Sequence, residues 1–314
     1  MRSPRVLQPK QHRQPSLSDV LVSVLGYEDR CIYAAREYAP TASKKLAIAF
    51  RDRMMFAYSA HKAWYEANNF SLLDYDRDTF ERAFIAFFRK AAAELERSHL
   101  NVAIDISSMS RPMLAQIIFA LVCLELPPTT VEFLYCPAKF SAPPESPLPL
   151  ERSEPVTPEY AGWSVRPDLP TSAVIGLGYE YGRALGALEF LEPSVTWAFV
   201  PHGEDRRYDR ACEIANADFW NLIPKERIHE YRVDNPFDTF VHIESLIYGL
   251  KANTRPTIMP FGPKLFALVS LLVAETHRPD VVVWRVSGEQ AEPPANRVAN
   301  GKFVRLPVRF ETRR

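Results

Sequence analysis

The segment Leu25-Gly26-Tyr27-Glu28 returns later in the chain as Leu177-Gly178-Tyr179-Glu180. Each copy follows a short apolar run, VLVSV in the first case and AVIG in the second. Each copy also precedes a helical pattern, EDRCIYAAREY or EYGRALGALEF. A four-residue match can arise by chance, so an internal duplication requires that the surrounding residues repeat as well.

The elements around the two copies do repeat, and they do so in the same order. Some are rich in the β-branched and aromatic residues typical of buried strands, and others have the apolar spacing of one helix face. In chain order the pairs are a strand, LAIAF (46–50) and VTWAF (195–199); a helix that opens on Asp-Thr-Phe (78–80 and 238–240); a strand that ends in a cationic turn, IDISSMSR (104–111) and TIMPFGPK (257–264); an apolar helix, MLAQIIFALVCL and LFALVSLLVA; and a closing strand, VEFLY (131–135) and VVVWR (281–285).

The spacing inside the two copies agrees closely. Gly26 and Arg111 lie 85 positions apart (111 − 26), and Gly178 and Lys264 lie 86 apart (264 − 178). Strands that alternate with helices of this length predict βαβ crossovers and a mainly parallel sheet. We therefore predict the α/β fold class, with two tandem Rossmann-like repeats.

The composition predicts where these repeats begin and end. A Pro-rich stretch favours an extended linker, because proline removes a donor and fixes the backbone. Asn300-Gly301 is a pair typical of a two-residue hairpin turn. The predicted organisation is a disordered arm at 1–17, a first repeat at 18–140, a Pro-rich linker at 141–170, a second repeat at 171–290, and a C-terminal tail or hairpin at 291–314.

Charge and cysteine content limit the classes of function. Lys plus Arg and Asp plus Glu both number 38, so no global field indicates binding of long nucleic acid. The four cysteines form no CxxC pair, which predicts neither a disulfide framework nor a metal site. No apolar run reaches the length of a membrane span, and the basic start is unlike a signal peptide. We expect a cytoplasmic protein.

Two loops in each repeat are the expected ligand sites. In an open α/β sheet, ligands bind beyond the carboxyl ends of the strands, where the strand order reverses. Gly26 and Gly178 would let the backbone approach a ligand, and helix-start amides favour an anion such as phosphate. Arg111 and Lys264 would add countercharge. In the alternative interpretation the glycines only permit tight turns and the cations are solvated.

The turn that ends at Arg111 is the most polar in the chain. It carries Asp105, Ser107, Ser108 and Ser110 between an apolar strand and an apolar helix. Hydroxyls with a carboxylate and a guanidinium suit phosphate or ribose, and Ser110 also suits a helix cap. The matching residues of the second repeat keep the cation and lose the hydroxyls: Pro260-Phe261-Gly262-Pro263-Lys264.

Other polar residues allow two interpretations each. Glu28 and Glu180 are candidate catalytic carboxylates or ribose ligands, but a Glu in a first helical turn also suits the helix dipole. Tyr27 and Tyr179 would flank a base or simply pack. His202 is a candidate general base or a solvated side chain. The sequence contains no GxxxxGK[ST], GxSxG or HExxH motif, and we predict no cofactor.

The turns IDISSMSR and MPFGPK resemble those of the CARF family and the related SAVED domains, which are sensors of cyclic oligonucleotides in prokaryotic anti-phage immunity. CARF domains carry a polar strand end and a small-residue turn with Lys or Arg at a helix start, and SAVED domains join two such units in tandem. The likeness covers about residues 18–290. Ser107-Ser108-Met109-Ser110 replaces the glycine-containing turn usual in CARF domains, whereas Phe261-Gly262-Pro263-Lys264 is nearer to it.

This resemblance implies ligand sensing coupled to an effector, which would be a separate protein. We expect a nucleotide or cyclic oligonucleotide as ligand; the alternatives are a nucleotide-processing hydrolase or transferase with Asp105, Glu28 or Glu180 as acid or nucleophile, and a non-catalytic structural subunit of a defence complex. Whether the chain is an enzyme stays open, and no catalytic motif favours it. The predicted ligand-binding residues are Gly26, Tyr27, Glu28, Asp105, Ser107, Ser108, Ser110, Arg111, Gly178, Tyr179, Glu180, Phe261, Gly262 and Lys264.

Overall fold

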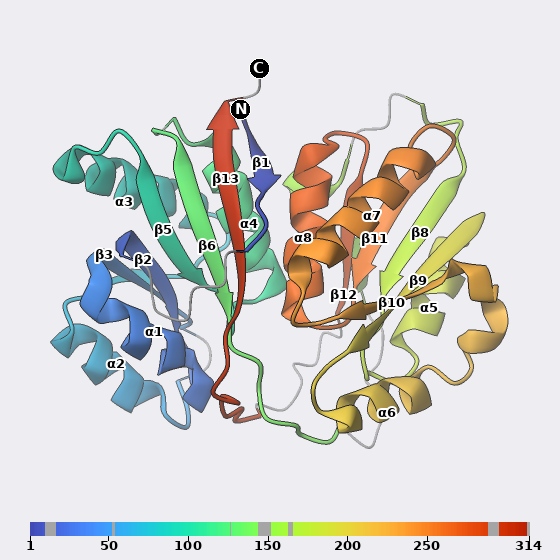
Figure 1. Cartoon of the computed structure of the whole chain (residues 1–314), viewed down its shortest axis with the longest axis horizontal. Coiled ribbons are helices and arrows are strands. Elements are labelled where there is room, and N and C mark those ends of the chain that lie inside the picture. The colour runs from blue at the N-terminus through green and yellow to red at the C-terminus, as the bar shows by residue number, and fades with distance from the viewer. Residues whose placement is uncertain are drawn as a thin grey trace. The chain divides into compact units, whose positions relative to one another are not determined.

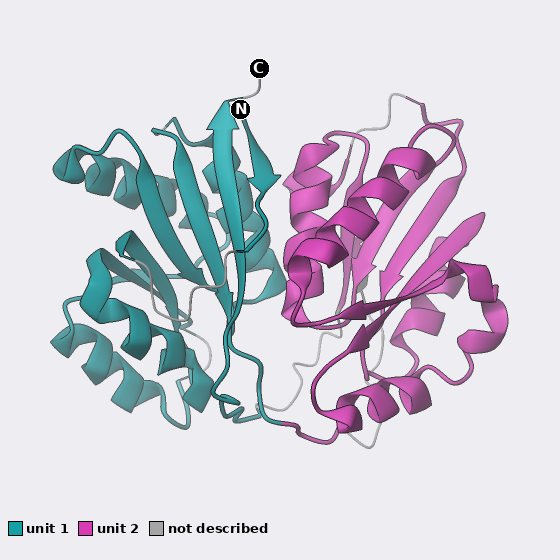
Figure 2. Cartoon of the chain, in the orientation of Figure 1, with its two compact units in different colours: residues 1–139, 295–314 teal, residues 140–294 magenta. Residues whose placement is uncertain are grey.

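The computed structural model describes residues 1–9, 17–51, 54–125, 127–143, 152–162, 166–287 and 295–312. The chain forms two units, shown in different colours in Figure 2. Unit 1 comprises Met1–Lys139 together with Ala295–Arg314, and unit 2 comprises Phe140–Pro294. Each unit has its own sheet and its own helices (Figure 1).

Unit 1 is built on a seven-stranded sheet. In spatial order its strands are β1 (Arg2–Val6), β13 (Val304–Thr312), β6 (Thr129–Tyr135), β5 (Leu100–Asp105), β2 (Ser18–Leu25), β3 (Ala42–Ala49) and β4 (Ser71–Asp74). The five strands from β6 to β4 are parallel, whereas β13 runs antiparallel to β6 and β1 antiparallel to β13. All eight residues of β2 are buried, as expected for a central parallel strand covered on both faces.

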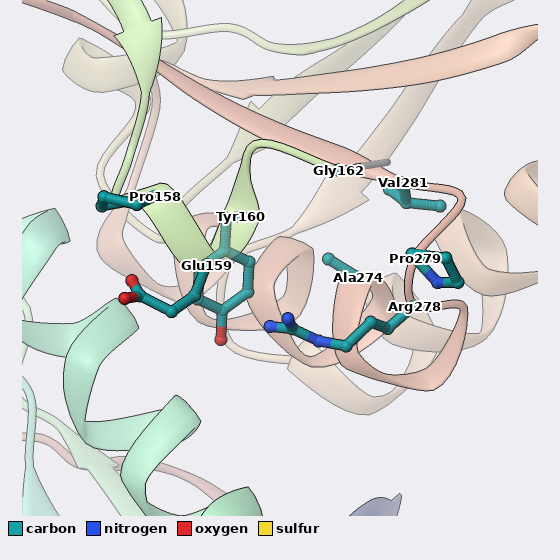
Figure 3. A pocket seen from close by; sticks show the side chains of 8 residues that line it. All are labelled: Pro158, Glu159, Tyr160, Gly162, Ala274, Arg278, Pro279 and Val281. Atoms are coloured by element: carbon teal, nitrogen blue, oxygen red, sulfur yellow. The ribbon is translucent and has the colours of Figure 1, made fainter. Parts of the chain in front are cut away.

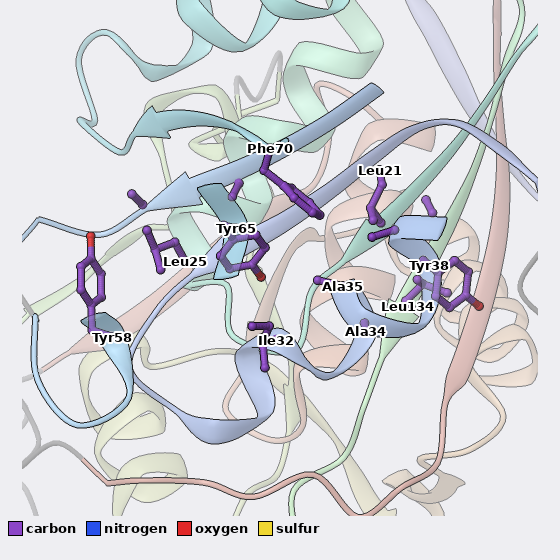
Figure 4. Packing of buried hydrophobic residues seen from close by; sticks show 14 residues of the cluster. Leu21, Leu25, Ile32, Ala34, Ala35, Tyr38, Tyr58, Tyr65, Phe70 and Leu134 are labelled. Carbon is purple, nitrogen blue, oxygen red and sulfur yellow. The ribbon is translucent and has the colours of Figure 1, made fainter. Parts of the chain in front are cut away.

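Four α-helices connect the parallel strands of unit 1: α1 (Tyr33–Tyr38), α2 (Tyr58–Ala67), α3 (Phe80–Leu95) and α4 (Arg111–Cys123). Helix α3 buries Phe80, Phe84 and Phe88, which its apolar spacing predicts. Helix α4 is apolar nearly all round and buries nine of its 13 residues. Figure 4 shows a second part of the core, where Tyr65, Ile32 and their neighbours pack against β2.

Unit 2 is built on a six-stranded sheet. In spatial order its strands are β10 (Ile228–Arg232), β9 (Val195–His202), β8 (Thr171–Gly176), β11 (Arg255–Pro260), β12 (Val282–Ser287) and β7 (Arg152–Pro155). Only β7 is antiparallel to its neighbour. The connecting α-helices are α5 (Arg183–Leu191), α6 (Arg206–Ala215), α7 (Pro236–Leu250) and α8 (Lys264–Thr276).

The parallel strands of the two units have the same order. Unit 1 reads β4-β3-β2-β5-β6 and unit 2 reads β10-β9-β8-β11-β12, so strands taken in chain order lie 3-2-1-4-5 in both. This is the order of a Rossmann-like sheet, and it places a topological switch point between the first and fourth strands. The predicted α/β class with two tandem Rossmann-like repeats is confirmed.

The chain ends differ from their predicted states. Arg2–Val6, part of the predicted disordered arm, forms β1, and Arg2 is buried, where it donates hydrogen bonds to Thr129 and Pro127. The predicted tail 291–314 supplies β13, which lies between β6 and β1. No local pattern reveals such strands, because each finds its partner about 170 residues or more away along the chain. Residues 10–16 of the predicted arm lie outside the described residues.

Two further boundaries also differ. Asn300-Gly301 does not join two strands of a hairpin, because the preceding Ala299 pairs with Ala138. Within the predicted linker, Arg152–Pro155 forms β7 and extends the sheet of unit 2 along β12. Edge strands tolerate proline, since one side of such a strand needs no partner. Linker residues 144–151 and 163–165 lie outside the described part of the chain.

Candidate functional site

The predicted loops lie at the switch point of each unit. In unit 1, β2 pairs directly with β5, so the loop after Leu25 and the turn after Asp105 leave the same edge of the sheet. In unit 2, β8 pairs with β11, and the loop after Gly176 and the turn after Pro260 do the same. Every predicted site residue is therefore at a strand exit of the kind that binds ligands in open α/β sheets.

Asp105 and Ser107 form a buried hydrogen-bonded turn in unit 1. The Asp105 carboxylate accepts hydrogen bonds from the Ser107 amide at 2.9 Å and from the Ser107 hydroxyl at 2.5 Å. The Ser107 hydroxyl also accepts a hydrogen bond from the Cys136 amide at 2.8 Å. These bonds link the exit of β5 to the exit of β6. Both side chains are buried, and we assign them to holding the turn rather than to contacting a ligand.

Ser108, Ser110 and Arg111 occupy the start of α4. Ser110 caps the helix, because its hydroxyl accepts a hydrogen bond from the Met113 amide at 3.3 Å. The Ser108 hydroxyl oxygen is buried and has no hydrogen-bond partner among the described residues. Arg111 is the first residue of the helix and its Nε atom is buried. An unsatisfied buried hydroxyl at a helix start is costly unless something binds it.

The β2–α1 loop of unit 1 contains a buried charged residue, Arg30, that no sequence motif indicated. Arg30 is only 2% exposed, and its Nε atom lies 2.5 Å from Oε2 of Glu28. Burial opposes the charge of Arg30, but the Glu28 carboxylate together with Tyr135 and Cys31 outweighs this effect, so the pKa of the guanidinium is raised. Glu28 is thus committed to an ion pair. Tyr27 packs against Phe56, with ring centroids 5.8 Å apart.

Gly26 is required by close packing. A Cβ atom at this position would lie 2.7 Å from Sγ of Cys31. The Gly26 carbonyl accepts a hydrogen bond from Nδ1 of the buried His61 at 2.9 Å. The glycine therefore accommodates the protein's own side chains, which supports the interpretation that it permits a tight turn.

In unit 2 the two switch-point loops touch through their backbones. A Cβ atom on Gly262 would lie 2.2 Å from the Leu177 carbonyl oxygen, and one on Gly178 would lie 3.0 Å from the Phe261 carbonyl oxygen. The amides of Phe261 and Gly262 both donate to the Gly176 carbonyl, at 2.9 and 3.1 Å. The glycines of unit 2 thus let two loops approach one another.

The remaining predicted residues of unit 2 also have neighbours. The Phe261 side chain is buried in the unit 2 core. Tyr179 packs on Tyr208 of α6, with ring centroids 5.7 Å apart. Glu180 lies 3.8 Å from the Arg183 guanidinium. Lys264 begins α8, which has no side-chain cap.

Asn216, which no sequence motif indicated, supports the unit 2 loop at Gly178. Asn216 donates from Nδ2 to the Gly178 carbonyl at 2.8 Å, and the same atom donates to Cys212. His202, at the end of β9, has its Nδ1 atom 3.2 Å from Asp209 and its Nε2 atom 3.6 Å from Glu230. His202 is thus held between two carboxylates rather than simply solvated.

Burial also affects the protonation state of the Cys136 thiol, which lies beside the β5–α4 turn of unit 1. Burial is the largest effect that raises the pKa of Cys136, and the nearby Asp105 carboxylate adds to it, while backbone amides of the C-terminal segment oppose it. The thiol therefore stays protonated near neutral pH. Cys136 lies beside Asp105, which ends β5, and beside residues 300–301 of the C-terminal segment.

A small hollow in unit 2 lies apart from these loops (Figure 3). It contains none of the predicted site residues and is lined by Pro158, Glu159, Tyr160, Gly162, Ala274, Arg278, Pro279 and Val281. Arg278 forms two hydrogen bonds with the buried Glu275, at 2.7 and 3.0 Å, and its guanidinium faces the Tyr160 ring. The Arg278 guanidinium in this hollow is therefore held in an ion pair with Glu275.

Over the residues that the structure describes, no cluster of His, Cys, Asp or Glu is arranged to hold a metal ion, and no helix is long and apolar enough to span a membrane. No protein-family model matches the chain, and no curated protein matches it either. The fold and the site geometry are therefore the basis for assigning a function.

Proposed function

We propose that the chain binds a nucleotide or a nucleotide-derived signal at the β5–α4 turn of unit 1 and acts through a separate effector protein. In this proposal a phosphate of the ligand lies at the start of α4. The resemblance to CARF and SAVED domains suggests a cyclic oligonucleotide as the signal and cytoplasmic anti-phage defence as the setting.

The observation that carries this proposal is the Ser108 hydroxyl, which is buried without a hydrogen-bond partner among the described residues. It lies three residues before Arg111, at the N-terminus of a 13-residue helix. Amides at a helix start favour an anion, and a guanidinium matches the geometry of phosphate. Ser108 and Arg111 would contact the phosphate, while Ser110 caps the helix, and Asp105 and Ser107 fix the turn.

Unit 2 supports this function less well. The loops after β8 and β11 approach each other closely through the backbones of Leu177 and Gly262, which leaves less room for a ligand at this switch point. Lys264 remains the residue there that suits an anion. We therefore assign the ligand to unit 1 and a supporting role to unit 2.

The three carboxylates considered for catalysis have partners within their units. Asp105 is bonded to Ser107, Glu28 pairs with Arg30, and Glu180 lies near Arg183. A nucleophile or general acid needs access to the reacting atom, and these contacts limit that access. The geometry therefore favours binding over a hydrolase or transferase reaction.

A thermal-shift screen tests the proposal. Linear and cyclic nucleotides are added to the wild-type protein and to the Ser108→Ala, Arg111→Ala and Lys264→Ala variants, and the nucleotides are analysed afterwards for turnover. We expect one ligand class to raise the Tm of the wild type without being consumed. The shift should fall in the first two variants and persist in Lys264→Ala. Consumption of the nucleotide would support the enzyme, and a Tm indifferent to every nucleotide would support a structural subunit.

A further inference from the structure

Residues 54–56, here called the apolar loop, form a run of exposed apolar side chains between β3 and α2. Met54, Met55 and Phe56 are 67%, 37% and 60% exposed. In the described part of the chain, every other exposed large apolar residue stands alone in the sequence. Single exposed apolar residues are common on protein surfaces, whereas a consecutive run is unfavourable in water unless it has a function.

The backbone holds Phe56 in an unusual conformation. Its φ angle is 47°, in the left-handed region that bulky side chains rarely adopt. The start of α2 anchors the loop, because the Tyr58 amide donates a hydrogen bond to the Met55 carbonyl at 3.0 Å. Tyr58 in turn packs in the same core cluster as Leu25, the last residue of β2 (Figure 4). The fold therefore keeps the Phe56 ring at the surface, beside the end of β2.

The Phe56 ring forms a pair with the ring of Tyr27. The two centroids lie 5.8 Å apart, and the planes are inclined by 47°. Tyr27 packs against the unit 1 core, so the pair joins one supported ring to one exposed ring. An exposed aromatic ring suits the flat face of a nucleobase, because every base has a π-face on which such a ring can stack.

The apolar loop follows a strand that ends at the same edge of the sheet as the proposed phosphate site. Strand β2 pairs with β3 on one side and with β5 on the other, and all three are parallel. Neighbouring strands lie about 4.8 Å apart, which places the ends of β3 and β5 about 10 Å apart. One nucleotide covers a span of this size between its phosphate and its base. A phosphate at Ser108 and Arg111 thus leaves the base within reach of Phe56.

We propose that Phe56 is the base-stacking residue of the unit 1 site: the base of the ligand lies on the exposed Phe56 ring, while the phosphate lies at the start of α4. The neighbouring Met54 and Met55 supply flexible apolar contact around the base. This inference rests on the proposed function of unit 1 and adds to it, because the ligand is recognised through its base as well as its phosphate.

Two probes that share the ribose and the phosphate test this assignment: adenosine 5′-monophosphate (AMP) and ribose 5-phosphate, which lacks the base. NMR titration measures the Kd of each probe for the wild type, Phe56→Ala and Phe190→Ala. Phe190 is a matched control in unit 2, because it is 61% exposed and its ring pairs with Trp284 at 6.0 Å. Stacking of one base should make the wild type bind AMP about 5- to 150-fold more tightly than ribose 5-phosphate.

The preference for AMP should disappear in Phe56→Ala and persist in Phe190→Ala. It should also persist in Phe56→Trp, which keeps a flat ring. Ribose 5-phosphate should bind all four proteins equally, which shows at the same time that the variants are folded. An unchanged preference for AMP in Phe56→Ala would overturn base stacking, leave the phosphate site intact and point to a protein partner for the apolar loop. If the wild type binds neither probe, the proposed phosphate site and the stacking assignment both fail.

Discussion

Replacing Glu28 with Gln should destabilise unit 1 strongly, because it removes the carboxylate that pairs with a buried guanidinium. Arg30 is 2% exposed and Glu28 is 16% exposed, with 2.5 Å between Nε and Oε2. Removing one partner of a buried pair leaves an uncompensated charge and costs roughly 3–5 kcal/mol. Because Glu28 retains some contact with solvent, we expect the lower end, a loss of about 3 kcal/mol in the free energy of unfolding.

The internal repeat supplies a matched control. Glu180 is the equivalent residue of unit 2, and it lies 3.8 Å from Arg183, with the two side chains 26% and 10% exposed. The longer distance and greater exposure weaken this pair, so Glu180→Gln should cost less than about 1 kcal/mol. The two substitutions are chemically identical, and the expected difference of about 2 kcal/mol comes from the shorter distance and the deeper burial of the Glu28–Arg30 pair.

Urea titration followed by pulse proteolysis measures the unfolding of each variant, and peptide-level hydrogen exchange assigns the loss to unit 1 or unit 2. Glu28→Asp tests whether a shorter carboxylate restores part of the stability. A loss below about 1 kcal/mol in Glu28→Gln, or equal losses in Glu28→Gln and Glu180→Gln, would refute the assignment of Glu28 to a buried ion pair.

Three other predictions follow from the contacts. Gly262→Ala should lower the stability of unit 2 by about 1–3 kcal/mol through its clash with the Leu177 carbonyl, whereas Gly249→Ala, in open space on α7, should raise stability by about 0.5–1 kcal/mol; urea titration measures both. Ser107→Ala should lower the free energy of unfolding by about 2–3 kcal/mol, because the buried Asp105 carboxylate and the Cys136 amide each lose a hydrogen-bond partner. Thermal denaturation measures this loss, and an unchanged Tm would contradict it. Burial lowers the pKa of His277 below 6.5, so the folded state keeps it neutral, and stability should fall as the pH falls below 6.5. The loss of stability at low pH should be smaller in His277→Gln than in the wild type. Equal urea midpoints of the wild type and His277→Gln across pH 5–7.5 would contradict this prediction.

The sequence predicted the α/β class and the tandem Rossmann-like repeats, because the elements around Gly26 and Gly178 recur in the same order along the chain. It did not predict the spatial order of the strands, and β4 and β10 were not among the predicted strands. It also predicted which loops lie at the switch points. Apolar patterning and spacing carry this information, since a buried parallel strand and its crossover helix are both local patterns.

The roles of individual residues depend on contacts that spacing does not encode. The carboxylate of Asp105 and the hydroxyl of Ser107 look like ligand groups in the sequence, but they bond to one another and to the amide after β6. Phe261 follows a strand, as a loop residue would, yet it packs into the core. The surroundings of Arg30 also depend on a residue far away in the chain, because its amide donates a hydrogen bond to the Arg297 carbonyl.

We propose that a phosphate-bearing ligand binds at the start of α4 in unit 1. Hydrogen exchange with the nucleotide that raises the Tm most locates the site directly. We expect protection of the peptides that cover 105–114, with those that cover 257–267 unchanged. Protection confined to 257–267, or no protection of 105–114 at saturating nucleotide, would contradict it.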